Sequence, residues 1–183
     1  RTFRAFGAPV LNNAGHMAFV GSLNWIAFEL NTTNDDGIWV GRPGAFRLAA
    51  READPVPGLS GVVYQSFTAL RLDEDGNIAF AARLKGAEVS IDNDTTLLAG
   101  IPGDIRVIAR EGDSAPGLEP GVKFGDLGLL NTLNFVIGRP GEVAFLCPLT
   151  GNVGFTNNQA VWRGPWDSVR AIAREGGATS HPD

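Results

Sequence analysis

Cysteine, positive charge and long apolar runs are all scarce in this sequence, and each scarcity excludes a class of protein. The single cysteine, Cys147, excludes an intrachain disulfide, and we expect it to be a small apolar residue of a strand. Fifteen basic against twenty acidic residues give a net charge of −5, which argues against nucleic acid as a partner. No apolar run reaches about 18 residues, so we expect no membrane span in this chain.

The residues that usually carry catalysis are equally sparse. Only two histidines are present, which leaves few ways to build a histidine-based triad or a zinc site. No serine lies in a nucleophile elbow, and no glycine-rich phosphate loop precedes a helix. We therefore expect a protein that is not an enzyme, with no catalytic residue and no cofactor.

Glycine, proline and apolar residues are plentiful instead. Twenty-four glycines and eleven prolines accompany a hydrophobic content of 44%. This composition supplies a core and is typical of many short strands that are joined by turns.

Two short motifs recur along the chain in a fixed order. Ala-Arg-Glu returns at intervals of 59 and 64 residues, and an Ala-Phe pair after a turn glycine returns at intervals of 61 and 65. Their recurring residues, which we take as structural repeat markers, are Arg51, Glu52, Arg110, Glu111, Arg174, Glu175, Phe19, Phe80 and Phe145. We expect the three phenylalanines to be buried at equivalent places. Matching periods of two independent motifs predict three tandem units, at 1–58, 59–117 and 118–183.

The sequence of each unit predicts four strands, and the alternation of apolar segments and turn residues is clearest in unit 2. Strands are expected at 63–72, 78–84 and 105–110, with a short third strand before the last of these. The predicted fold is all-β: three tandem four-stranded antiparallel sheets, arranged as β-propeller-like blades or as stacked β repeats.

The fourth strand indicates how the sheets are covered. Strict alternation would place Val107 and Ala109 on one face, as it would Leu48 and Ala50 in unit 1. The opposite face is also apolar, because it carries Ile108 in unit 2. We therefore expect sheets that are packed on both faces.

Around the Ala-Phe marker, the chain resembles bacterial surface proteins that are built from tandem repeats. Those repeats have an Asn-x-x-Gly-x-x-Ala-Phe core and a downstream Arg-Glu-Gly-Asp…Pro-Gly stretch. Residues 12–19 match the core in full, whereas Asp73 and Gly138 replace the asparagine in units 2 and 3, and residues 110–117 match the downstream stretch. The resemblance implies an extracellular or cell-surface protein with β-propeller-like repeats, and it implies no activity.

Three sets of residues have a functional interpretation beside a structural one. Trp25 and Trp166 occupy no shared repeat position, so they are candidates for stacking on surface glycans. Asn31 and Asn93 begin glycosylation sequons on the connection between the second and third strands. Asp73 and Asp75 are weak calcium candidates, and a plain hairpin turn is the preferred interpretation.

The Arg-Glu markers also look like catalytic charges. Because they recur once per unit, we expect one structural role repeated three times. An arginine side chain suits that role, since it can bond backbone carbonyls and a carboxylate of the next sheet together.

The chain is expected to associate with itself. Three blades are too few to close a propeller, and an array that does not close has an apolar sheet at each end. The residues after Arg174 together with those from Arg1 to Gly15 number 24, against 25 and 31 between a marker arginine and the next turn glycine within the chain. This spacing suits head-to-tail contact, which gives a filament or a ring. A window cut from a longer array of the same units predicts the same spacing.

The leading hypothesis is thus an extracellular structural or adhesive repeat protein that is not an enzyme and that assembles head-to-tail. Two alternatives remain open: a carbohydrate- or protein-binding propeller module, and a propeller-type hydrolase.

Overall fold

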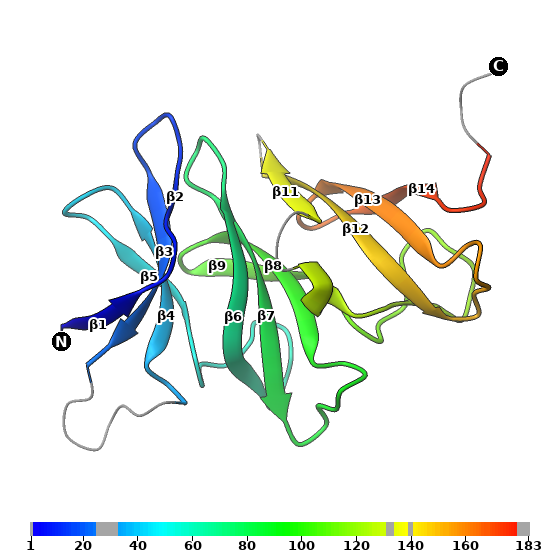
Figure 1. Cartoon of the computed structure of the whole chain (residues 1–183), viewed down its shortest axis with the longest axis horizontal. Helices are drawn as coiled ribbons and strands as arrows, with labels where there is room; N and C mark the ends of the chain where they lie inside the picture. The colour runs from blue at the N-terminus through cyan, green and yellow to red at the C-terminus, as the bar shows by residue number, and fades with distance from the viewer. Residues whose placement is uncertain (1, 25–32, 131–133, 139–140, 179–183) are drawn as a thin grey trace.

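The computed structural model of the chain describes residues 2–24, 33–130, 134–138 and 141–178. In these ranges the fold is all-β, and the one helical element is a 3-10 turn, η1 (Leu127–Leu130). The strands form three antiparallel sheets that follow one another along the long axis of the molecule (Figure 1). The predicted fold class is therefore confirmed.

Each sheet is built from consecutive strands, and we call the three sheets with their connections units 1, 2 and 3. Unit 1 contains β1 (Phe3–Phe6), β2 (Val10–Leu11), β3 (Met17–Leu23), β4 (Asp36–Gly41) and β5 (Arg47–Arg51). Unit 2 contains β6 (Val62–Leu72), β7 (Ile78–Gly86), β8 (Thr95–Ile101) and β9 (Asp104–Arg110). Unit 3 contains β10 (Val122–Phe124), β11 (Phe135–Gly138), β12 (Glu142–Gly151), β13 (Gln159–Pro165) and β14 (Arg170–Arg174).

The strand order is the same in the three sheets. It is β1-β3-β4-β5, β6-β7-β8-β9 and β10-β12-β13-β14, and β2 and β11 pair with the second strand of their sheets. Units 1 and 3 thus have five strands where four were expected, because their first strand is interrupted. Pro9, which lacks an N–H group, lies in the interruption of unit 1, and η1 lies in that of unit 3.

The marker phenylalanines occupy one register position in the three sheets. Phe19 lies opposite Trp39, Phe80 opposite Leu98 and Phe145 opposite Trp162. Their exposed fractions are 8%, 0% and 2% in chain order, so the expectation that all three are buried is confirmed.

The fourth strands do not alternate strictly, and here the sequence prediction is wrong. Leu98 pairs with Val107 whereas Leu97 pairs with Ala109, so a register shift separates Val107 from Ala109. The extra residue is a β-bulge, which turns the two side chains to opposite faces of the sheet. The same irregularity separates Leu48 from Ala50 in unit 1.

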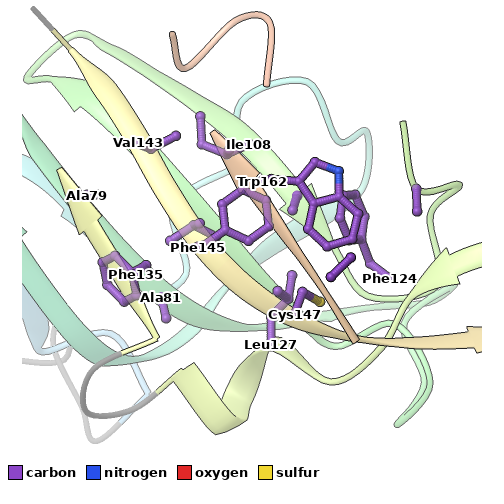
Figure 2. Packing of buried hydrophobic residues seen from close by; sticks show 14 of the residues in the cluster. Ala79, Ala81, Ile108, Phe124, Leu127, Phe135, Val143, Phe145, Cys147 and Trp162 are labelled. Carbon is purple, nitrogen blue, oxygen red and sulfur yellow. The ribbon is translucent and has the colours of Figure 1, made fainter. Parts of the chain in front are cut away.

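Two buried clusters hold the units together. One joins residues of units 1 and 2, such as Ile38 and Phe80, and the other joins residues of units 2 and 3, such as Leu97 and Phe145. Figure 2 shows the second cluster, in which Phe135 lies beside Ala79 and Ala81 of the neighbouring sheet. The expectation of packing on both faces holds for unit 2.

A glycine with positive φ precedes each turn into the fourth strand. Gly41, Gly100 and Gly164 have φ of 153°, 146° and 155°. A Cβ atom at Gly100 would lie 2.0 Å from the carbonyl oxygen of Asp104, and the equivalent distances at Gly41 and Gly164 are 2.4 and 2.7 Å. No other residue fits this close approach of two backbones.

Truncation of Phe80 should show what the core contributes. We expect Phe80→Ala to lower the free energy of unfolding by about 3–5 kcal/mol, because a fully buried aromatic leaves a cavity. Phe155→Ala is the matched control, since Phe155 is 97% exposed, and it should cost less than about 0.5 kcal/mol. Chemical denaturation measures both. Equal losses in the two variants would contradict the buried position of Phe80.

The turn after each fourth strand offers a second test. Ala53, Gly112 and Gly176 are equivalent and have φ of 63°, 82° and 73°. A Cβ at Gly112 would lie 2.9 Å from the carbonyl oxygen of Asp92. We expect Gly112→Ala to cost at least about 1 kcal/mol in denaturation experiments. The reverse change, Ala53→Gly, should leave stability unchanged or raise it by about 0.5 kcal/mol. A loss on Ala53→Gly would contradict strain at this position.

Candidate functional site

Each sheet has two apolar faces of different character. The phenylalanine face carries the marker phenylalanine and its cross-strand partner, for example Phe80 and Leu98 in unit 2. The alanine face carries the residues on either side of that phenylalanine in the strand, for example Ala79 and Ala81. Both faces of unit 2 are buried.

The two internal junctions use these faces in the same way. The phenylalanine face of unit 2 packs on the alanine face of unit 1, where Ala18 and Ile38 are 0% exposed. The phenylalanine face of unit 3, with Phe145 and Trp162, packs in turn on the alanine face of unit 2. Each junction therefore joins unlike faces, always in the same direction along the chain.

The phenylalanine face of unit 1 is open in this structure. Phe6 is 66% exposed and Phe3 is 38% exposed, whereas Tyr64, which occupies the position of Phe3 in unit 2, is 3% exposed. Phe3 contacts Phe6 and Trp39 with ring centroids 5.0 and 5.2 Å apart. The face is thus a contiguous aromatic surface in contact with water.

The alanine face of unit 3 is open as well. Ile172 is 54% exposed, whereas its equivalent Ile108 is 9% exposed in the junction between units 2 and 3. An ion pair with a 2.8 Å contact between Arg163 and Glu142 lies on this face. Ala99 has the position of Arg163 in unit 2, so this open face is more polar than the internal ones.

The connections between units add backbone bonds to each junction. After β5, the N–H of Ala53 donates to the carbonyl of Tyr64, and the N–H of Tyr64 donates to the carbonyl of Asp54. After β9, Gly112 and Asp113 make the same two bonds with Phe124. Each connection therefore pairs with the outer edge of the next unit's first strand.

A buried indole also distinguishes the open face from the covered ones. Trp162 Nε1 donates a 3.2 Å hydrogen bond to the carbonyl of Pro116, which belongs to the connection before unit 3. The equivalent Trp39 Nε1 is buried and has no hydrogen-bond partner among the described residues. A buried donor without an acceptor costs about 1–3 kcal/mol, so unit 1 lacks a group that unit 3 receives from its neighbour.

The marker arginines stay mostly within their own units. Nε of Arg110 donates to the carbonyl of Asn93 at 3.0 Å, and Nε of Arg174 donates to the carbonyl of Asn157 at 2.9 Å. Arg174 Nη1 also contacts both carboxylate oxygens of Glu119, at 2.6 and 2.8 Å. Arg51 departs from this pattern, because its Nη2 lies 3.4 Å from Asp54 and its Nε has no partner among the described residues.

The marker glutamates close the start of the third strand. Their carboxylates accept from the backbone N–H of Asp36 in unit 1, the hydroxyl of Thr95 in unit 2 and the N–H of Asn158 in unit 3. Burial raises the pKa of Glu52 and of Glu111, and nearby carboxylates add to it. These contacts repeat in each unit, so each glutamate joins the end of the fourth strand to the start of the third strand of its own sheet.

The structure uses the remaining candidates in local packing. Asp73 Oδ1 accepts from the N–H groups of Asp75 and Asn77, so this carboxylate closes its hairpin turn. No group of three or more His, Cys, Asp or Glu in the described ranges has metal-binding geometry. Trp166 is half-buried, and its ring lies so close to Gly141 that a Cβ there would be 2.8 Å away.

The sequon at Asn93 is engaged in the fold. The Asn93 side chain accepts from the N–H of Ser90 and donates to the carbonyl of Glu88, and Thr95 is 1% exposed. Counted from the marker arginines, the equivalents of Asn93 are Asn34 and Asn157, so this asparagine is a repeat position with a structural role. Asn31 and Trp25 lie outside the described residues.

Cys147 is buried in β12, as expected for an apolar strand residue. Burial raises the pKa of its thiol to about 12. The thiol therefore stays protonated at neutral pH and is a poor nucleophile.

Sheets of one strand order, joined by unlike apolar faces and by strand-pairing connections, define an all-β repeat protein. The chain matches the model of a family described as "Family of unknown function (DUF7453)" over residues 1–181, and it belongs to that family. No curated protein and no solved structure matches the chain. Within the described residues, no helix is both long and apolar enough to cross a membrane.

Arg110 provides a test of the structural role of the markers. We expect Arg110→Ala to lower the free energy of unfolding by about 1.5–3 kcal/mol, because a charged side chain loses its bond to a backbone carbonyl. Arg106→Ala, on the exposed side of the same strand, should have no measurable effect in denaturation experiments, since its partners Asp104 and Asp167 are also exposed. If the two variants were equally stable, the structural role would be wrong.

Proposed function

We propose that this chain is a structural repeat protein of the cell exterior, not an enzyme, and that copies of it associate head-to-tail. In this proposal the phenylalanine face of unit 1 docks on the alanine face of unit 3 of another copy. The observation that carries it is that the chain joins these two kinds of face twice internally and leaves one of each open to water.

The chemistry of the open faces supports a reversible contact. Burial of Phe6 and Ile172 removes large apolar side chains from water, which favours association. The Arg163–Glu142 pair opposes it, because docking would take two charges out of water. The balance favours association that depends on concentration over irreversible aggregation.

The direction of the contact determines the kind of assembly. A contact between unlike faces is head-to-tail, so it gives a closed ring if the rotation closes and a filament if it does not. We favour an open filament over a two-chain ring of six sheets.

The placement outside the cell, free or on the surface, rests on the resemblance to bacterial surface repeats. Residues 12–19 carry the core motif of those repeats in full. Detection of the protein on intact cells by an antibody tests this part separately from self-association.

Binding of surface glycans, a protein-binding role and a hydrolase activity are less well supported. The glycan hypothesis depends on Trp25 and Trp166, of which Trp166 packs against Gly141. The hydrolase hypothesis needs carboxylates that converge, and the marker glutamates of the described units instead serve separate strands.

Two complementary variants test the proposal by sedimentation velocity. Phe6→Asp places a carboxylate on the open phenylalanine face, and Ile172→Asp places one on the open alanine face. We expect the mass of the unmodified chain to rise with concentration, while each variant alone stays monomeric because a buried carboxylate is costly.

An equimolar mixture of the two variants retains one intact face of each kind. It should therefore form dimers and nothing larger. Ile91→Asp is the control, since Ile91 is 81% exposed and lies in the connection between β7 and β8 of unit 2, which carries neither open face. It should associate like the unmodified chain. A stable monomer of the unmodified chain at high concentration would rule the proposal out.

A further inference from the structure

At each internal junction, the connection between two sheets pairs through backbone hydrogen bonds with the first strand of the next unit. Within the chain, Gly112 N–H donates to the carbonyl of Phe124 at 2.9 Å, and Asp113 carbonyl accepts from Phe124 N–H at 2.9 Å. The neighbouring residues Ser114 and Lys123 form an antiparallel bridge, as Pro55 and Val63 do at the first junction.

The turn after β14 has the same shape but pairs with no strand of the described part of the chain. Gly176 has φ of 73°, and Gly177 N–H donates to the carbonyl of Arg174 at 3.0 Å. The equivalent bond from Asp113 to Arg110 is 3.2 Å. Gly176 N–H has no partner among the described residues, so the turn presents a donor that both internal junctions use.

The outer edge of β1 presents the matching groups. Phe3 has the register position of Tyr64 and Phe124, since all three lie opposite a leucine, and in unit 1 this is Leu23. Leu23 N–H donates to the carbonyl of Asp35, and the equivalent leucines donate in the same way to the residue just before their third strands. The backbone of Phe3 therefore faces the edge, where its carbonyl accepts, among the described residues, a single long bond of 3.4 Å from the Asn24 side chain.

An independent observation points to the same missing segment. Trp39 Nε1 is buried with no acceptor among the described residues, and in unit 3 the acceptor is the carbonyl of Pro116. Pro116 lies in the connection that pairs with β10, four residues after Gly112. At the junction between units 2 and 3, one connection supplies both the acceptor for the indole and the bonds to the strand edge. Among the described residues, Trp39 and the edge of β1 have no such connection.

We propose that the segment from Gly176 of one copy adds to the outer edge of β1 in another copy as an antiparallel strand, in the register of the internal junctions. Gly176 N–H donates to the carbonyl of Phe3, the carbonyl of Gly177 accepts from Phe3 N–H, and Ala178 lies opposite Thr2. This inference rests on the proposed head-to-tail association and specifies its register. Because the turn at Gly176 is formed beforehand, little ordering is needed on docking.

Disulfide cross-linking between single-cysteine variants tests the register. Residues opposite each other in antiparallel strands have Cα atoms about 4.5–5.5 Å apart, which suits a disulfide. Thr2→Cys and Ala178→Cys change exposed residues, and the native Cys147 is buried. Mixed at equal concentration in a glutathione redox buffer, the two variants should form a disulfide-linked heterodimer, and neither should cross-link alone.

Ala5→Cys mixed with Ala178→Cys is the register control, since Ala5 lies three residues from Thr2 along the chain. We expect its cross-linked yield to be at least tenfold lower. Sedimentation of the same mixtures separates the two proposals. Association without a preference for Thr2 would overturn the register and leave head-to-tail docking intact, whereas absence of association would overturn both.

Discussion

The contact between a phenylalanine face and an alanine face is the interaction on which the rest of this structure depends. A sheet with two apolar faces cannot remain a single layer in water, so each sheet needs neighbours on both sides. Unit 2 meets this condition, since Phe80 and Ala79 are each 0% exposed. The large side chains of one face fill the space that the small side chains of the other leave, which fixes the direction in which units succeed one another.

Local features of each unit hold its strands in the geometry that this contact needs. Gly100 permits the close approach of β8 to the turn before β9, and the β-bulge beside it turns Val107 and Ala109 to different faces. Arg110 and Glu111 then tie the end of β9 to the loop and strand start that precede it. Each of these features repeats at a fixed distance from the marker arginine. The sequence of one unit therefore specifies its own sheet and also the connection that pairs with the next sheet.

The repeat pattern was sufficient to predict the all-β class, the strands of unit 2 and the burial of Phe19, Phe80 and Phe145. It did not reveal the bulge, because Val107, Ile108 and Ala109 are all apolar and no alternation marks the extra residue. It indicated that Asp73 and Asn93 lie in turns, but it did not reveal which backbone N–H groups their side chains accept from, since any residue carries such groups. It predicted an apolar sheet at each end but not which residues are exposed there, because Phe3 and Tyr64 are both aromatic and only the neighbour of Tyr64 covers it.

The two open faces are each partly protected from water, and by different means. On unit 1, Phe3 and Phe6 pack edge-on against Phe19, with centroids 5.8 and 5.6 Å away, so that Phe19 is only 8% exposed. On unit 3, the Arg163–Glu142 pair makes the face polar where internal faces are apolar. Such features restrain indiscriminate pairing of sheets. A face protected in this way favours a partner that supplies both a matching apolar surface and a strand for the open edge. At both internal junctions one neighbouring unit supplies the two together, because the connections after β5 and β9 pair with the first strand of the next sheet.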